Sequence, residues 1–173
     1  MKRAFLIFLS FALTTLIACS SSGKNQKKSK DPQVKSSQNQ KTTVSVSYDT
    51  LTKRPISGFD YKKTSISMEI WKAWASQNLA LIENIVPKIP ETHALQVTGH
   101  ADSRGPETPT KNKPGNLKIS TERALTIYNL LLAKGIDSSK LVYKGVGSSQ
   151  PLKGVNPKDP KQRRVSFVLI SKE

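Results

Sequence analysis

The stretch from Thr98 to Ala124 constrains the fold of this chain more than any other part of the sequence. Apolar residues alternate with polar ones just before it, which predicts a short strand over 94–98. Gly99 follows at once and favours a turn at the end of that strand. Ser120 is a typical helix N-cap and predicts a helix over 121–134. The stretch is therefore expected to run from a strand, through a loop, into a helix.

Two charged side chains in this stretch predict a binding site. Asp102 lies just beyond the C-terminal end of the predicted strand, where α/β sheets present ligand-binding loops. Arg123 falls in the first turn of the predicted helix, where the helix dipole disfavours a cation by about 0.3–1 kcal/mol. Together with the free N–H groups of that turn, Arg123 predicts a carboxylate site, and Asp102 would receive an ammonium. The alternative interpretation is a structural ion pair between the two side chains.

Periodicity elsewhere predicts the other elements. Alternating apolar residues predict strands over 43–48 and 141–144, and residues 51–65 predict a loop or hairpin. Residues 165–170 are apolar on both faces, which predicts a strand that is central or well covered. A helical pattern between the first two strands ends at Pro87. The order β-α-β-α-β-β predicts a small two-layer α/β sandwich, with helices on one face of a mixed sheet.

The first predicted helix carries both tryptophans of the chain. Ser67 can cap its N-terminus. Trp71 and Trp74 share helical spacing with apolar residues, which favours a place in the core or at its edge over a carbohydrate-binding platform. Gly135 predicts the C-cap of the second helix.

Four short motifs follow one another along the chain: Gly99-His100-x-Asp102, Asn116-x-x-Ile119-Ser120-x-x-Arg123-Ala124, Gly145-x-Gly147, and Arg163-Arg164-Val165. Together they resemble the signature of the OmpA-like, peptidoglycan-binding C-terminal domain, over roughly residues 43–170. The segment 54–63 and the run Asp-Pro-Lys-Gln-Arg-Arg-Val look closest to leptospiral OmpA-like surface lipoproteins.

The resemblance implies a ligand and the residues that bind it. In the family the motif Asp and Arg hold the diaminopimelate of the peptidoglycan stem peptide, which implies these roles for Asp102 and Arg123. It also implies that Asn116, Ala101 and Arg164 belong to the peptidoglycan-binding site. The sequence leaves open whether the stem of the host carries diaminopimelate or ornithine.

The chain departs from the family pattern in three places. The loop from Gly105 to Asn116 is longer than usual and rich in proline and charge. Gln162 stands where the family has Asn before the double arginine, and Ile119 replaces the usual Leu. The role of the enlarged loop does not follow from the resemblance.

The first 18 residues predict a lipoprotein signal peptide. A basic start precedes an apolar run of fifteen residues, which is short for a membrane span of about 20 residues. Leu16-Ile17-Ala18-Cys19 resembles a bacterial lipobox, which implies cleavage before Cys19 and its acylation, with palmitate among the acyl groups. Cys19 is the only cysteine, so no disulfide forms within the chain. The alternative is an ordinary secretory cleavage next to a chance cysteine.

Residues 19–42 predict a disordered tether, and residues 43–173 predict the single folded domain. The tether is rich in Lys, Ser and Gln and has almost no large apolar side chain with which to order itself. The domain carries 20 basic and 11 acidic side chains, a net charge of +9. Its 131 residues suffice for one modest core.

Catalytic chemistry finds little support in the sequence. There is no Gly-x-Ser-x-Gly elbow, phosphate-binding loop or dinucleotide fingerprint. His100 and Asp102 would make half a metal site, with no evident third ligand, so a structural histidine is favoured. We therefore expect a protein that is not an enzyme and that has neither cofactor nor metal.

Two binding functions remain. The first is a lipoprotein that anchors the outer membrane to the cell wall from its periplasmic face, through lipid on Cys19 and non-covalent binding to peptidoglycan. The second is a basic adhesion module for host matrix or anionic polymer, which the high charge favours; the sequence is compatible with exposure at the cell surface. Nucleic acid is not expected as a partner, because no aromatic platform accompanies the lysines.

Overall fold

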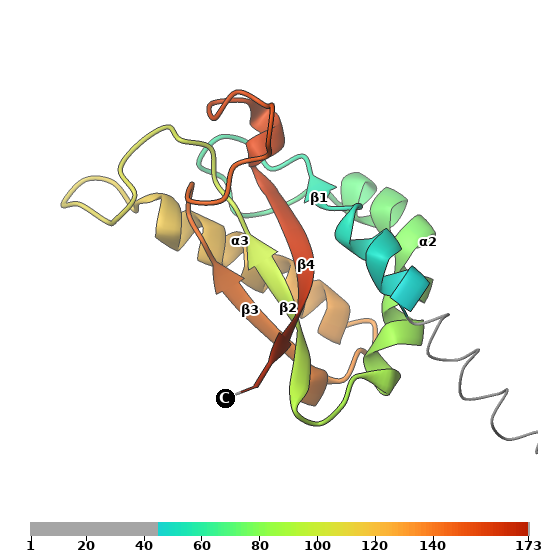
Figure 1. Cartoon of the computed structure of the whole chain (residues 1–173). Helices are drawn as coiled ribbons and strands as arrows, with labels where there is room; N and C mark the ends of the chain where they lie inside the picture. Colours follow the sequence, from blue (N-terminus) through green and yellow to red (C-terminus); the bar gives the residue numbers. More distant parts are fainter. Residues whose placement is uncertain (1–44, 173) are drawn as a thin grey trace, which may run out of the picture. The chain divides into compact units, whose positions relative to one another are not determined.

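A four-stranded mixed sheet forms the centre of the fold (Figure 1). The computed structural model describes residues 45–172, and its strands lie in the order β1-β4-β2-β3. They are β1 (Ile56–Ser57), β2 (His93–Gly99), β3 (Leu141–Gly145) and β4 (Arg164–Ser171). β2 pairs in parallel with β3 and antiparallel with β4. The predicted signal peptide, the lipidated cysteine and the tether lie outside the described residues.

Two long helices pack on one face of this sheet and confirm the predicted α/β sandwich. They are α2 (Met68–Ile85) and α3 (Asn116–Leu132). Both helices and alternate residues of β2 and β4 contribute buried side chains to the same hydrophobic core. The members from the helices and strands include Trp71, Ile82, Leu95, Val97, Ile127, Leu131, Val165 and Phe167. None of the helices within residues 45–172 combines the length and hydropathy needed to cross a membrane.

The start of α2 agrees with the sequence. The Ser67 hydroxyl accepts a hydrogen bond from the N–H of Ile70 at 3.3 Å, as expected of an N-cap. Trp71 is fully buried, and Trp74 stacks between Trp71 and Phe167 with centroid separations of 5.8 and 5.3 Å. The two tryptophans therefore lie in the core and at its edge, as predicted.

The strand predicted over 43–48 is wrong, because residues 45–52 form a helix. Their core-facing positions are Ser47 and Leu51, one helical turn apart, while Val46 of the apparent alternation is 60% exposed. The Tyr48 hydroxyl accepts a hydrogen bond from the N–H of Leu169 at 2.8 Å, so this helix reaches the edge of β4.

The first strand lies later in the chain, inside the segment predicted as a loop or hairpin. It is the two-residue β1, which pairs antiparallel with the start of β4, Ile56 opposite Val165. β4 is therefore paired on both sides at its N-terminal end and is central, as predicted. Val168 on its outer face is 38% exposed, so that face is open.

Helix α3 begins at Asn116, five residues before the position that Ser120 predicted. Its first N–H groups are capped by the backbone of the preceding loop: the N–H of Asn116 donates to Pro106 O at 2.8 Å, and that of Leu117 donates to Glu107 O at 3.0 Å. The sequence suggested a side-chain cap, but backbone carbonyls brought by the loop satisfy the same donors. Arg123 accordingly lies in the helix interior and not in its first turn.

Ser120 has a different role from the predicted cap. It is fully buried, and its hydroxyl accepts a hydrogen bond from the N–H of Gly147 at 2.8 Å. A Cβ on Gly99 would lie 1.9 Å from Ser120 O, and one on Gly145 would lie 2.3 Å from Thr121 N. These glycines let α3 touch the strand backbones directly, which fixes where the helix lies over the ends of β2 and β3.

Candidate functional site

A small pocket opens beyond the C-terminal end of β2, with a cavity volume of about 50 Å³. Its walls come from the turn after β1, the loop after β2, the enlarged loop 105–115, the start of α3 and the residue before β4. The lining includes Tyr61, Lys62, Ala101, Asp102, Arg104, Lys113, Asn116, Arg123 and Arg163. Four of the five predicted site residues, Ala101, Asp102, Asn116 and Arg123, are therefore brought together in one pocket.

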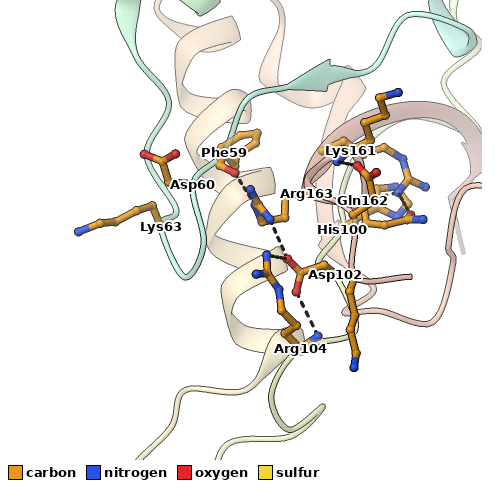
Figure 2. Close-up of polar contacts among 12 residues, drawn as sticks. Phe59, Asp60, Lys63, His100, Asp102, Arg104, Lys161, Gln162 and Arg163 are labelled. Atoms are coloured by element: carbon orange, nitrogen blue, oxygen red, sulfur yellow. Dashed lines mark hydrogen bonds and ion pairs between the residues drawn. The ribbon is translucent and has the colours of Figure 1, made fainter. Parts of the chain in front are cut away.

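Asp102 is the only acidic side chain in the pocket lining, and its side chain is only 3% exposed. Its Oδ2 accepts hydrogen bonds from Arg104 Nη2 at 2.7 Å and from Arg163 Nη1 at 2.9 Å, and its Oδ1 accepts the Arg104 N–H at 3.1 Å. Figure 2 shows the carboxylate between the two guanidinium groups. Burial raises the pKa of Asp102, but the hydrogen bonds from Arg104 and Arg163 outweigh it and lower the pKa overall.

Arg123 does not form an ion pair with Asp102, which was the alternative interpretation of the sequence. It is 1% exposed and donates to three backbone carbonyls: Nε to Lys63 O at 2.9 Å, Nη1 to His100 O at 3.0 Å, and Nη2 to Asp60 O at 3.0 Å. Burial, with Arg163 nearby, lowers the pKa of Arg123 to about 10, so the side chain stays charged at neutral pH. A guanidinium has five N–H donors, and these three hydrogen bonds use three of them.

Arg163 and Arg164 have separate roles. Arg163 holds Asp102 and also donates from Nε to Phe59 O at 2.6 Å, which ties the pocket to the turn after β1 (Figure 2). Arg164 lies outside the pocket lining and donates to the carbonyls of Gln162 and Gln150 at 3.2 and 2.9 Å. Its predicted contact with the ligand therefore has no geometric support.

His100 is buried just after β2 and precedes the pocket residue Ala101 in the chain. Its Nε2 lies 2.8 Å from Ser166 Oγ, and its Nδ1 has no hydrogen-bond partner within the described residues. Burial, together with the charge of Arg164, lowers the pKa of His100 to about 3. No group of three His, Cys, Asp or Glu side chains with metal-binding spacing occurs within residues 45–172.

The enlarged loop forms one wall of the pocket and is anchored at its base. The Glu107 carboxylate accepts the Ser148 hydroxyl at 2.7 Å and the Ser148 N–H at 3.1 Å. Lys113, Pro114 and Gly115 from this loop line the pocket. The loop whose role the sequence left open therefore both caps α3 and contributes a cation to the pocket.

Sequence reasoning missed four arginine or lysine side chains, Lys62 among them, and an aromatic ring. Arg104 and Arg163 hold Asp102, Lys113 lies on the enlarged loop, and Tyr61 lies under the Arg104 guanidinium, 4.3 Å from its ring centroid. Two of them carried a sequence signal: Arg163 belongs to the motif Arg163-Arg164-Val165, and Arg104 lies two residues after the motif carboxylate, where a cation can fold back onto it. The others come from distant segments.

The pocket has a strong positive balance. Its lining has five cationic side chains and one carboxylate: Lys62, Arg104, Lys113, Arg123 and Arg163 against Asp102. Such a site favours an anionic group, and guanidinium groups bind carboxylates with forked, charge-assisted hydrogen bonds. The buried Asp102 adds a position for a cation next to these donors.

A model of the OmpA family matches residues 59–164. Solved structures with the same fold include the peptidoglycan-associated lipoprotein from Burkholderia pseudomallei, which is 19% identical with a TM-score of 0.52 over 68% of this chain and 90% of that one. The C-terminal domain of MotB from Helicobacter pylori is 19% identical with a TM-score of 0.51, over 69% of this chain and 86% of that one. No curated protein sequence matches the chain.

Proposed function

The chain belongs to the OmpA family, and on this premise we propose that it is a non-catalytic module that binds the diaminopimelate of peptidoglycan stem peptides. The observation that carries the proposal is the pocket itself, in which a buried carboxylate lies among five cations. The side chain of diaminopimelate ends in one carbon that bears both an ammonium and a carboxylate. The pocket offers one partner for each of these charges.

Each predicted residue has a proposed part in binding. The ligand ammonium donates to Asp102, and the ligand carboxylate accepts from the Arg123 guanidinium. Asn116 and Ala101 form the adjoining wall, only 5% and 7% exposed. Arg164 contributes indirectly, by holding the backbone before β4.

Two assays that compare the wild type with Asp102→Asn test the proposal: binding to isolated sacculi, and calorimetry with a diaminopimelate stem peptide. The amide keeps the shape of the carboxylate but cannot carry its charge, so we expect a loss of about 10-fold or more in affinity for a diaminopimelate stem peptide, measured by calorimetry. Lys153→Ala removes an exposed charge away from the pocket and is the matched control. A folded Asp102→Asn protein with wild-type affinity would remove Asp102 from the site.

We further propose that acylated Cys19 fixes the chain to the outer membrane, so that the domain links this membrane to the wall. The similar fold of a peptidoglycan-associated lipoprotein supports this proposal together with the lipobox. Cys19→Ser should move the protein to the aqueous phase of a detergent partition, and a mutant that still enters the detergent phase would contradict this anchor.

The basic charge of the domain favours a second candidate, adhesion to host matrix or another anionic polymer. Salt separates the two functions. Binding through many lysines weakens steeply with salt, whereas a buried, hydrogen-bonded site is screened much less. Binding to sacculi that persists at about 0.3 M salt, while binding to heparin disappears, supports the wall anchor; a parallel loss of both favours adhesion.

A further inference from the structure

In this structure a side chain of the protein itself, Arg104, occupies the position next to the Asp102 carboxylate. The Arg104 guanidinium donates to Oδ2 at 2.7 Å, and the Asp102 side chain is only 3% exposed. This is the position that an ammonium from a ligand has to take. A ligand therefore reaches Asp102 only when Arg104 moves away.

Arg104 is the partner of Asp102 that can move. Its side chain is 37% exposed, and its buried Nε has no hydrogen-bond partner within the part of the chain that the structure describes. Arg163 is only 10% exposed and is also bound to the Phe59 carbonyl. If Arg104 moves away from Asp102, only a side chain that already faces solvent becomes more exposed. Arg163 stays in place and continues to neutralise the carboxylate.

Tyr61 gives the displaced side chain a surface to rest on. The Arg104 guanidinium carbon lies 4.3 Å from the Tyr61 ring centroid, and Tyr61 lines the pocket and is 42% exposed. A guanidinium can slide over an aromatic face and keep its cation–π contact. Arg104 therefore has a route out of the ammonium position that stays within the pocket lining.

We propose that Arg104 determines the specificity of this pocket, an inference that rests on the proposed binding of diaminopimelate. The side chain leaves Asp102 readily only if the ligand supplies a new carboxylate within its reach. In diaminopimelate that carboxylate is on the same carbon as the ammonium. A lysine or ornithine side chain brings the ammonium alone, so it displaces Arg104 without giving it a partner.

Two synthetic stem peptides test this inference, L-alanyl-γ-D-glutamyl-meso-diaminopimelate and the same tripeptide with L-lysine. They differ by one carboxylate. In wild type we expect the diaminopimelate peptide to bind at least about 10-fold more tightly, by calorimetry. In Arg104→Ala the lysine peptide should bind about five-fold more tightly than in wild type, because it no longer competes for Asp102. The ratio between the peptides should shrink accordingly.

Lys111→Ala is the matched control, because it removes one charge from the adjoining enlarged loop without changing the pocket lining. It should leave the ratio between the two peptides unchanged. An Arg104→Ala protein that weakens both peptides equally, or keeps the wild-type ratio, overturns the role of Arg104 while the proposed function stands. If the wild type binds neither peptide, the proposed function fails and this inference fails with it.

Discussion

The residue that the sequence placed at the ligand, Arg123, also holds the pocket together. Three of its N–H groups bind carbonyls of two segments, the turn after β1 and the loop after β2. The sequence predicted that Asp102 and Arg123 act together as one site, each at the end of an element. Asp102 is instead neutralised by Arg104 and Arg163, so the two residues of the motif have different structural contexts.

Replacing Arg123 should therefore lower stability as well as binding. Arg123→Ala leaves three carbonyls without their donor and a cavity in the core, and we expect a loss of about 2–4 kcal/mol in the free energy of unfolding. Urea denaturation measures it. Lys118→Ala, an exposed cation on the same helix, should change stability by less than about 0.5 kcal/mol. A fully stable Arg123→Ala protein would contradict the structural role.

His100 should make the fold sensitive to acid. Burial lowers its pKa to about 3, so between pH 6.5 and 3 the unfolded chain binds a proton that the folded chain does not. The free energy of unfolding should then fall by up to about 1.4 kcal/mol for each pH unit in this window, through His100 alone. His100→Asn keeps a neutral partner for Ser166 and should flatten this slope in thermal melts from pH 7 to 4.

His93→Gln is the matched control for the loss of an imidazole. Asp102, whose pKa is lowered, adds stability above its unfolded pKa that is lost as the pH falls further. Equal slopes in wild type and His100→Asn would show that His100 carries none of the pH dependence.

At the scale of elements, the contact between α3 and the ends of β2 and β3 decides the geometry of the pocket. Gly99 and Gly145 allow the helix backbone to touch the strands, and Ser120 fastens the helix to the N–H of Gly147. The enlarged loop caps the start of α3 and continues into the pocket wall. The position of the helix and the shape of the pocket are thus set by the same contacts.

A single methyl group should disrupt this contact. In Gly99→Ala the Cβ would meet Ser120 O at 1.9 Å, and backbone atoms cannot yield as a flexible side chain would. We expect a loss of about 3 kcal/mol or more, at the upper end of overpacking effects. Gly154→Ala is the control, because its Cβ meets nothing within 4 Å and only the positive φ of 75° carries a cost, about 1 kcal/mol. Similar melting temperatures for both variants would contradict the steric role of Gly99.

At the scale of the whole domain, the core extends beyond the segment that the family model matches. That match begins at residue 59, yet Leu51 and Ile56, which precede it, are only 0% and 1% exposed. The helix of residues 45–52 is not part of the sheet, but it contacts β4 through the Tyr48 hydroxyl. This N-terminal segment is an integral part of the folded domain.

Chains that begin at different residues should differ accordingly. One that begins at residue 43 should fold with full stability, because it keeps every described contact. One that begins at residue 59 loses the buried Leu51 and Ile56, each worth about 2–5 kcal/mol, from a total of only about 5–15 kcal/mol. It should be largely unfolded by circular dichroism at 25 °C, and a cooperative melt equal to that of the longer chain would contradict this account.

Local patterns in the sequence determined much of the framework. Alternation fixed β2 and β3 to within a residue at their ends, and the helical spacing after Ser67 fixed α2, because both signals depend on neighbours along the chain. The same reasoning failed for residues 45–52, where a short apolar alternation also fits one face of a helix. It failed at the start of α3, where carbonyls of the preceding loop replaced a side-chain cap.

The candidate site, like the fold, was predictable from the sequence only in part. The sequence alone predicted a binding site that includes Asp102, Asn116, Ala101 and Arg123, and it placed Asp102 just after the end of a strand. The partners of these side chains were decided only by the tertiary structure, because they come from segments far away along the chain: Arg123 binds the carbonyl of Lys63, 60 residues earlier, and Asp102 binds Arg163, 61 residues later. No local pattern encodes such contacts, since they exist only after the sheet has assembled and α3 has packed against it.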